Sequence, residues 1–410
     1  MKISSVQPFL LSYPLPEPLK LPYYGGERII LKRDAMLIRV QTTDGLTGYA
    51  PGQGSERAQK DIERIIAPFL MGRTLSDPDS LRVQFQQGAG SDPELNKVYG
   101  SVEVALYDLV GKANGVPLSE LIGGRVRDHI RLYGSAGMYQ SPEAYAAEAA
   151  GVRAMGFGAY KMRPGMGPEQ DVETVRLMRE AVGPDFDLMV DAHTWWRMGD
   201  RSYSEETVAK IAEQLEKYRI AWLEEPLPPD DHDALARLRA LDYVPVASGE
   251  HEPSELRFLD LIGSNCVDFV QMDVVCQGGY AAARRLFPDI ARAGIHFAFH
   301  SWGTALELVA AAQLGVCWPE SVVRWLEYPC YTHDGGAGMY PFPLASEILK
   351  HPLTIHRGEL ALSREPGLGV EIDESVIWRY PWIPGPWSTF RLDSPPEVWA
   401  VSGDHSEKWS

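Results

Sequence analysis

From about residue 130 onward, short apolar runs recur along the chain, and most are followed by an amphipathic helical stretch such as EAYAAEAAGVRAMG (143–156). Strands that alternate with helices indicate a parallel sheet. Eight such strands favour a (β/α) barrel over an open doubly wound sheet, although the alternation alone permits both. The eight runs are IRLYGSAG (130–137), FGAYKMR (157–163), FDLMVDAH (186–193), IAWLEEP (220–226), VPVASGE (244–250), VDFVQMD (267–273), IHFAFHS (295–301) and VVRWLEY (322–328).

The first 120 residues have a different pattern, which predicts an α+β unit. The run AMLIRVQTTDGLTGYAP (35–51) reads as two strands joined by a turn at Asp44–Gly45. Helices are predicted over 57–70 and 101–115, the second ended by Gly115 and Pro117. From about residue 340 the chain is rich in Pro and Trp, so we expect an extended segment that packs back on the rest.

Composition excludes several classes of protein. The chain has 410 residues, 45% of them hydrophobic, and a formal net charge of −17. The charge argues against a nucleic-acid or anionic-membrane partner, and an anionic substrate would need local cations or a metal. No window approaches the ~20 apolar residues of a membrane span. The four cysteines lack metal-like spacing and are too few for a disulfide scaffold, so we expect a cytoplasmic protein.

Polar residues collect where the predicted barrel strands end. In a barrel of this type, catalytic residues lie at the C-terminal ends of the strands, so these side chains should converge on one mouth. They are Lys161, Arg163, Asp191, His193, Glu224, Glu225, Glu250, Asp273, His300 and Glu327.

Three consecutive strands in this set supply the carboxylates Asp191, Glu224 and Glu250. Three converging carboxylates repel one another unless they are protonated or neutralised by a cation. Oxygen ligands without cysteine favour a hard ion, Mg²⁺ before Mn²⁺ or Ca²⁺. Each acid taken alone could instead be a solvated strand end or a helix cap. Their occurrence in successive units favours a metal site.

At these positions the chain resembles the mandelate racemase subgroup of the enolase superfamily. The resemblance rests on the ordered motifs VDAH, WLEEP, ASGE, VQMDVVCQGG and FHSWGTA, and it covers nearly the whole chain. It implies a (β/α)7β barrel of the TIM type (residues 125–340). An α+β N-terminal capping domain (1–124) would cover the barrel, and a C-terminal segment (341–410) would complete the cap. It also implies a homo-oligomer.

The resemblance implies a reaction and a set of roles. Members of the family abstract a proton α to a carboxylate and hold the resulting enediolate on Mg²⁺. The implied metal ligands are Asp191, Glu224 and Glu250. His300 pairs with Asp273 as the base, and Glu327 is a hydrogen-bond donor or electrophilic partner of the substrate carboxylate. Without the neighbouring Asp273, His300 would read as a packed core histidine.

Two positions favour dehydration over racemisation. Racemases of the subgroup carry Lys-x-Lys on the second barrel strand, whereas this chain has Lys161 followed by Arg163. Arginine is a poor general base but suits clamping a carboxylate. His193, two residues after Asp191, resembles the extra histidine of the sugar-acid dehydratases, where it assists departure of a β-hydroxyl. A hydrogen-bonding role for His193 around the metal remains the alternative.

We therefore expect a Mg²⁺-dependent dehydratase that converts an aldonate or aldarate into a 2-keto-3-deoxy acid. The alternatives are a racemase or epimerase of a 2-hydroxy acid and a non-catalytic metal-binding barrel. In the cap, Tyr24 and Arg28 of LPYYGGER (21–28) could hold the far end of the substrate, although an ordinary turn with exposed aromatics fits equally. Strand alternation predicts that His251 faces away from the site.

Overall fold

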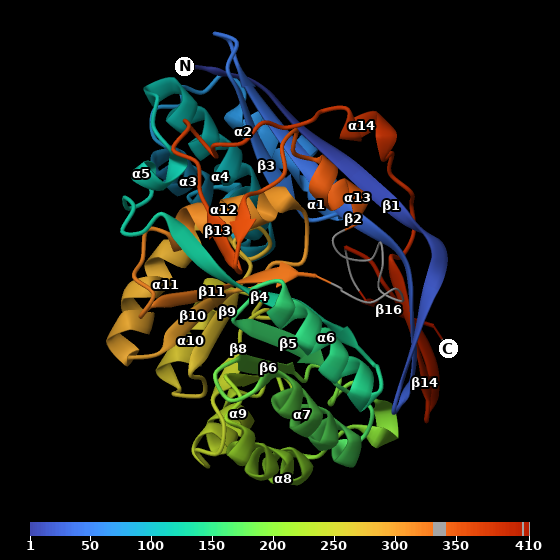
Figure 1. Cartoon of the computed structure of the whole chain (residues 1–410). Coiled ribbons are helices and arrows are strands. Elements are labelled where there is room, and N and C mark those ends of the chain that lie inside the picture. The colour runs from blue at the N-terminus through green and yellow to red at the C-terminus, as the bar shows by residue number, and fades with distance from the viewer. Residues whose placement is uncertain (331–341, 404–405, 410) are drawn as a thin grey trace.

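The eight apolar runs form eight parallel strands that close into a barrel (Figure 1). The computed structural model describes residues 1–330, 342–403 and 406–409, which include the whole barrel. Each strand pairs in parallel with the next, and the last pairs with the first, with Glu327 beside Tyr133. The strands are β4 (His129–Met138), β5 (Ala159–Arg163), β6 (Asp187–Asp191), β7 (Trp222–Glu224), β8 (Val246–Ser248), β9 (Phe269–Met272), β10 (His296–Phe299) and β11 (Val323–Pro329).

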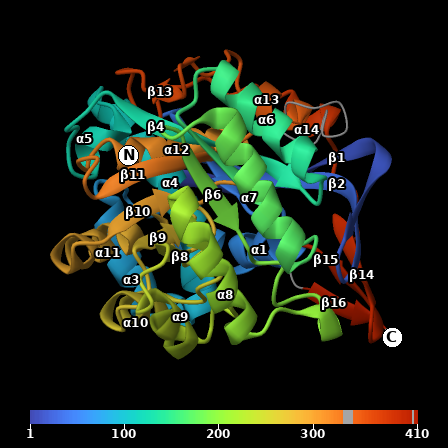
Figure 2. The ribbon, with the colours of Figure 1, turned by 60° about the horizontal axis from the view of Figure 1, so that its bottom comes forward.

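Seven α-helices connect these strands within residues 129–329, all of which are described, and they surround the barrel (Figure 2). The predicted (β/α)7β arrangement is therefore confirmed. Among the described residues, no helix combines the length and the apolarity that a membrane crossing requires. The seven helices are α6 (Pro142–Ala154), α7 (Pro168–Val182), α8 (Glu205–Leu215), α9 (His232–Arg239), α10 (Glu255–Gly263), α11 (Gly279–Ala293) and α12 (Ala305–Gly315).

The barrel interior is filled by side chains below the polar strand ends. Side chains alternate along a strand, so one set of residues points inward from all eight strands. Tyr133, Trp222, Phe269 and Trp325 belong to this buried inner layer. The Trp222 ring contacts Tyr133 edge-on at 5.3 Å and Phe269 at 5.0 Å between centroids. This packed layer forms the floor on which the polar strand ends lie.

The N-terminal cap is built on a long antiparallel hairpin of β1 (Ile3–Tyr23) and β2 (Gly26–Thr42). Strand β3 (Thr47–Gly52) pairs with β2 through the predicted turn at Asp44–Gly45. The predicted helices are present as α1 (Glu56–Asp61), η1 (Ile62–Ile66) and α2 (Ala67–Leu70) in succession, and as α4 (Pro93–Asn114). The cap also contains α3 (Pro78–Gln86), η2 (Ala89–Ser91) and α5 (Leu118–Leu121).

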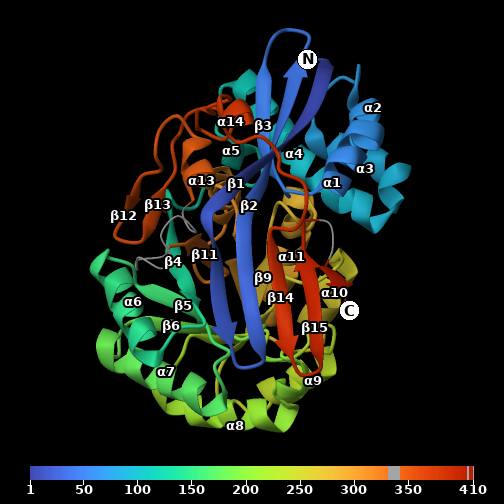
Figure 3. The ribbon, with the colours of Figure 1, turned by 90° about the vertical axis from the view of Figure 1, so that its right-hand side faces the viewer.

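The C-terminal part of the chain completes the cap sheet. Strands β14 (Ser388–Asp393), β15 (Pro396–Val401) and β16 (Ser406–Trp409) extend it in the order β1-β2-β14-β15-β16. Figure 3 shows the β1–β2 hairpin running beside β14 and β15 toward the barrel. The short strand β13 (Glu359–Ala361) pairs with β4, and β12 (Ile355–His356) pairs with β13. Along the chain, α13 (Pro343–Glu347) precedes β12, and α14 (Val376–Arg379) lies between β13 and β14. The cap is therefore formed by both ends of the chain.

Helix α4 holds the cap against the barrel through a close backbone approach. A Cβ added at Gly100 would lie 2.3 Å from the carbonyl carbon of Gly278, where only hydrogen fits. Beside it, the buried Arg82 guanidinium donates to the Glu103 carboxylate at 3.0 Å and to the Gly278 carbonyl oxygen at 2.9 Å. This junction fixes the position of the cap relative to the β9–α11 loop at the barrel mouth.

We expect Gly100→Ala to destabilise the protein by about 1–3 kcal/mol, the usual cost of forcing extra atoms into a packed contact. The expected result is a lower apparent Tm in a thermal denaturation scan. Gly263→Ala is a suitable control because Gly263, at the end of α10, has open space around its Cβ position. A Tm for Gly100→Ala equal to that of Gly263→Ala would contradict the tight junction.

Candidate active site

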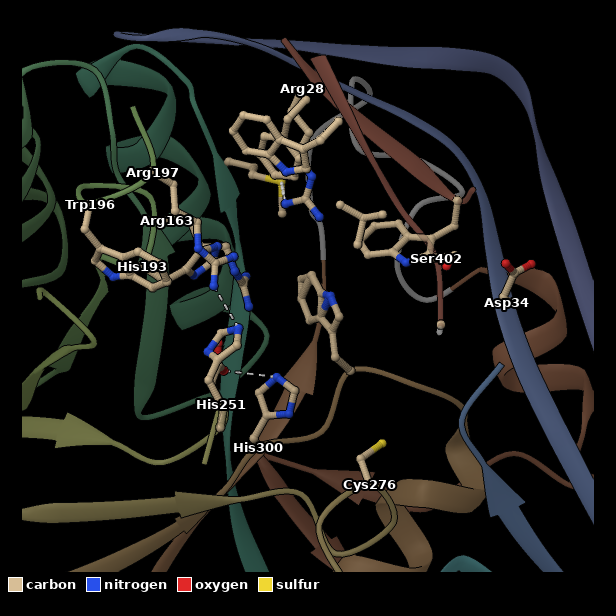
Figure 4. Close-up of a pocket in the computed structure, with 18 of the residues that line it drawn as sticks. Arg28, Asp34, Arg163, His193, Trp196, Arg197, His251, Cys276, His300 and Ser402 are labelled. Atoms are coloured by element: carbon tan, nitrogen blue, oxygen red, sulfur yellow. Dashed lines mark hydrogen bonds and ion pairs between the residues drawn. The ribbon is translucent and has the colours of Figure 1, made fainter. Parts of the chain in front are cut away.

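The polar strand ends meet in a cavity of about 1060 Å³ between the barrel mouth and the cap. Figure 4 shows His193, Arg197, His251 and His300 on the barrel side, with Arg28 across the cavity. The predicted convergence on one mouth is therefore observed. Of the residues expected at the site, Arg28, Arg163, His193, Glu250, Asp273 and His300 line the cavity. Lys161, Asp191, Glu224 and Glu327 are fully buried directly beneath them.

Lys161 lies at the centre of the buried layer. Its Nζ is 2.6 Å from Glu224 Oε1, 3.1 Å from Glu327 Oε1 and 3.4 Å from Asp191 Oδ2. Burial lowers the pKa of Lys161, but these carboxylates outweigh burial and raise the pKa well above its usual value. The ammonium group therefore stays protonated and neutralises part of the acidic cluster.

Arg163 contacts two of the carboxylates that also contact Lys161. Its Nε is 3.0 Å from Asp191 Oδ2, and its Nη2 donates to Glu327 Oε1 at 3.3 Å. The guanidinium also lies 3.9 Å from the centroid of the Trp302 ring. These contacts fix the guanidinium plane at the cavity floor, where it can receive a carboxylate.

The carboxylates are crowded enough to disfavour full ionisation. Burial raises the pKa of Glu224 to about 8, with Lys161 opposing this increase and Asp191, Glu250 and Glu327 adding to it. Trp222 Nε1 and Gln271 Nε2 donate to Glu224 Oε2 at 2.8 and 2.7 Å. Asp191 Oδ2 and Glu250 Oε2 are buried and accept no hydrogen bond. Oxygen atoms of this kind can ligate a hard cation.

The position of His251 corrects a prediction from the sequence. Strand alternation placed His251 away from the site, yet it lines the cavity. Gly249 has a φ of +136°, so the chain leaves strand geometry before Glu250 and alternation no longer applies. His251 Nδ1 lies 2.6 Å from Glu225 Oε2, and Arg197 Nη2 lies 3.1 Å from His251 Nε2. Glu225, Glu250 and His251 thereby form the one group of three potential ligands among the described residues whose ligand atoms lie within 4.8 Å of one another, and it shares Glu250 with the predicted metal ligands.

His300 and Asp273 come together as the sequence predicts. His300 Nδ1 lies 3.4 Å from Asp273 Oδ2, and its Nε2 lies 3.2 Å from Glu250 Oε2. Backbone N–H groups of Val275 and Cys276 donate to Asp273 Oδ1 and hold that carboxylate in place. Burial lowers the pKa of His300, but the carboxylates of Glu250, Glu327 and Asp273 together raise it to about 10.

His193 is bonded to the residue with which it shares a strand end. Its Nδ1 lies 2.6 Å from Asp191 Oδ1. Burial lowers the pKa of His193 more than the Asp191 carboxylate raises it. With Nδ1 engaged by Asp191, Nε2 is the ring nitrogen that can reach a substrate.

Glu327 lies among three cationic side chains. Burial raises its pKa, but Lys161, His300 and Arg163 outweigh burial and lower the pKa to about 2. The carboxylate accepts a hydrogen bond from the backbone N–H of Ser301 at 3.1 Å. These contacts let Glu327 orient Lys161 and Arg163, and its role toward the substrate carboxylate stays a prediction.

The hairpin tip does not place Tyr24 in the site. Tyr24 is 41% exposed, and Arg28 is the residue of this segment that lines the cavity. The backbone N–H of Tyr24 donates to Gly165 O at 2.7 Å, and its ring lies beneath Arg201 at 5.0 Å. The loop expected over residues 21–28 is instead a tight turn, because Tyr23 already pairs with Gly26. The tip of this hairpin contacts the barrel loops.

Aromatic residues beyond the sequence prediction line the cavity wall. Trp302 follows β10, whereas Trp387, Phe390 and Trp399 come from the C-terminal segment. The signal available in the sequence was the richness of that segment in tryptophan, but only strand pairing with β2 reveals which rings face the site. The cavity is therefore built from barrel, cap and C-terminal strands together.

A capped (β/α)7β barrel with a lysine, acids and a His–Asp pair at its mouth defines an enzyme of the enolase superfamily. Two family models match the chain. The model described as enolase C-terminal domain-like matches residues 144–376. The model described as mandelate racemase / muconate lactonizing enzyme, N-terminal domain, matches residues 18–123. The chain belongs to the mandelate racemase / muconate lactonizing enzyme family.

Relatives and solved structures span nearly the whole chain. D-galactarolactone cycloisomerase from Agrobacterium fabrum is 28% identical and covers 93% of this chain and 99% of its own. D-xylonate dehydratase from Haloferax volcanii is 28% identical and covers 83% and 84%. The crystal structure of a putative mandelate racemase from Bordetella bronchiseptica, complexed with 2-oxoglutarate/phosphate, superposes with a TM-score of 0.82 at 27% identity and covers 94% and 99%.

Proposed function

We propose that the protein is a Mg²⁺-dependent dehydratase that removes the α-proton of a sugar acid and eliminates its 3-hydroxyl. The observation that carries the proposal is the His300–Asp273 pair, which lines the cavity together with Glu250, above the buried Asp191 and Glu224 of the predicted metal-ligand set. The similarity to D-xylonate dehydratase supports this reaction class.

The proposed metal ligands are Asp191, Glu224 and Glu250. They offer only oxygen atoms, which are the ligand atoms that Mg²⁺ prefers. Two of these oxygens, Asp191 Oδ2 and Glu250 Oε2, are buried and have no hydrogen-bond partner. When bound, the ion would supply the positive charge that makes a proton beside a carboxylate acidic enough to remove. The protein contributes Lys161 and Arg163, which hold the substrate carboxylate beside the acids.

His300 is the proposed base. The 3.4 Å contact of Asp273 Oδ2 with Nδ1 orients the imidazole, so Nε2 is the nitrogen that would take the proton. With all three nearby carboxylates charged, the ring is protonated at neutral pH. A cation bound at Glu250 would weaken the effect of that carboxylate and lower the pKa of His300 toward neutrality. Binding of the cation and the ability of His300 to accept a proton are therefore coupled.

The second barrel strand disfavours the racemase alternative. A racemase needs a base on each face of the α-carbon. Lys161 is held protonated among three carboxylates, and Arg163 is a guanidinium, so neither supplies a base opposite His300. We assign both to binding the substrate carboxylate, with Arg163 lining the cavity and Lys161 buried beneath it.

His193 is the proposed acid that protonates the leaving hydroxyl. Hydroxide is a poor leaving group and needs a proton delivered as the bond breaks. His193 lines the cavity beside Asp191 and presents Nε2 to the substrate. A proton taken up at Nε2 would be stabilised by the 2.6 Å contact of Nδ1 with the Asp191 carboxylate.

Ring-opening elimination from a sugar lactone is a second candidate function. The similarity to D-galactarolactone cycloisomerase favours it, and the Trp and Phe wall of the cavity suits the flat face of a ring. The α-proton abstraction is the same in both reactions. The leaving group differs, because a lactone oxygen departs as a carboxylate and needs no proton.

We expect His193→Asn to lower the rate of dehydration by about 10²–10⁴-fold, the usual contribution of a general acid. Exchange of the α-proton with D₂O should persist, since that step depends on His300. NMR of the sugar acid in D₂O measures both. The control is His129→Asn. His129 begins β4, at the end away from the barrel mouth, and its side chain is 53% exposed, so this variant should behave as the native enzyme. Loss of exchange together with dehydration would contradict the assignment.

The test of the proposed function is a panel of aldonates, aldarates and their lactones, incubated with enzyme and Mg²⁺ and assayed with semicarbazide for 2-keto acid. A dehydratase yields 2-keto acid from open-chain acids. Product from lactones alone supports the second candidate. If no compound gave a 2-keto acid but the configuration at the α-carbon was inverted, both candidate functions would be wrong and the protein would be a racemase.

A further inference from the structure

The wall opposite the barrel mouth is the inner face of the cap sheet. Arg28 on β2 pairs with Phe390 on β14, which pairs with Trp399 on β15. Paired residues on neighbouring strands project to the same face, and all three line the cavity. The far end of a bound substrate therefore meets a sheet face held in place by strand pairing (Figure 4).

Arg28 is held rigidly on this face. Its guanidinium carbon lies 4.7 Å from the ring centroid of Phe390 and 5.0 Å from that of Trp387. Its Nε donates to Ser388 Oγ at 3.2 Å, and Nη1 reaches Met138 Sδ at 3.7 Å. The side chain belongs to a residue only 7% exposed, so this is a largely desolvated cation with a fixed plane.

A second guanidinium shares the same indole. The Arg33 guanidinium carbon lies 5.1 Å from the Trp387 centroid and 5.7 Å from that of Trp302. Arg33 is 3% exposed and lines the cavity. Trp302 in turn contacts Arg163 at the barrel mouth, so cations extend from the substrate carboxylate site to the far wall. Two cations close together in a poorly solvated wall repel each other, and an anion bound beside both lowers that cost.

Among the described residues, two acids also line this part of the cavity. Asp34 is balanced by Lys32, whose Nζ lies 3.0 Å from Asp34 Oδ2, and by Ser12, whose hydroxyl donates to Asp34 Oδ1 at 2.6 Å. Glu397 lies on β15 at the same sheet face and adds one negative charge. Arg28 and Arg33 together carry two positive charges, so the wall stays favourable to an anion.

We propose that Arg28 and Arg33 bind a second carboxylate at the far end of the substrate, so that the substrate class is a sugar diacid and not an aldonate. This inference rests on the proposed function for the placement of the first carboxylate at Arg163 and the metal. The cavity of about 1060 Å³ is at the upper end of the ~300–1,000 Å³ typical of small-molecule sites, so a six-carbon diacid fits.

Equilibrium binding tests the proposal without turnover. His300→Asn enzyme loaded with Mg²⁺ is titrated by calorimetry with matched pairs, galactarate against galactonate and glucarate against gluconate. We expect the diacid of at least one pair to bind at least about tenfold more tightly, the effect of one charge-assisted hydrogen bond. Arg28→Gln should weaken diacid binding by about 10- to 100-fold and monoacid binding much less.

The matched control is Arg391→Gln, because Arg391 is exposed on β14 beside Phe390 and projects to the opposite face. It should leave the diacid preference intact. Equal affinity for both acids of every pair, equal weakening of both by Arg28→Gln, or no binding of either acid would overturn the proposal. Arg28-dependent binding of a diacid that the native enzyme does not dehydrate would instead overturn the proposed function and leave this inference standing.

Discussion

Removal of divalent metal is expected to abolish catalysis completely and reversibly. Asp191, Glu224 and Glu250 are crowded, and without a cation the charge that develops on the substrate has no adequate partner. Dialysis against EDTA should eliminate 2-keto acid formation, and added Mg²⁺ should restore it. Full activity after chelation would contradict the metal assignment.

Ligand variants identify which acids hold the ion. We expect Asp191→Asn to weaken the binding of Mn²⁺, as measured by EPR. The affinity should fall by at least roughly 10- to 100-fold, which is the cost of losing a residue that only hydrogen-bonds to a metal ligand. The informative control is Glu225→Gln, since Glu225 belongs to the cluster with Glu250 and His251, which shares only Glu250 with the proposed ligand set. If Glu225→Gln weakened binding and Asp191→Asn did not, the ion would lie in that second cluster.

Substitution of His300 by asparagine is expected to lower kcat by about 10²–10⁴-fold, since the variant loses the proposed general base. Mg²⁺ binding and overall stability should change little, because Asp273 remains fixed by the N–H groups of Val275 and Cys276. Both product formation and α-proton exchange should fall together.

This pattern distinguishes His300 from His193, whose variant should retain exchange. A His300→Asn enzyme that exchanged the α-proton at the native rate would contradict the assignment. In that case another group at the barrel mouth would have to be the base. His251 is a candidate, because its Nδ1 lies 3.5 Å from Glu250 Oε1.

The barrel and its polar strand ends could be predicted because both depend on local periodicity. An apolar run of four to eight residues followed by a polar pair places Asp191 or Glu224 at a strand end whatever the rest of the chain does. The pairing of His300 with Asp273 was implied by the family resemblance, and their positions on adjacent strands of a parallel sheet supported it.

The cap was less predictable because its pairing is long-range. Strand β1 spans 21 residues despite Pro8 and Pro14, which edge strands tolerate since one row of their N–H groups lies outside the ladder. Strand β14 pairs with β2 across some 360 residues, and only that register brings Phe390 beside Arg28. The local backbone turn at Gly249, which brings His251 into the cavity, likewise has no periodic signature.

The most direct measurement is NMR of a sugar acid in D₂O with native enzyme and Mg²⁺. Abstraction at C2 followed by elimination predicts loss of the C2 proton signal and formation of a 2-keto-3-deoxy acid with deuterium from solvent at C3. Retention of the C2 proton in all sugar acids and lactones tested, or its exchange with inversion and no loss of the 3-oxygen, would contradict the proposed elimination.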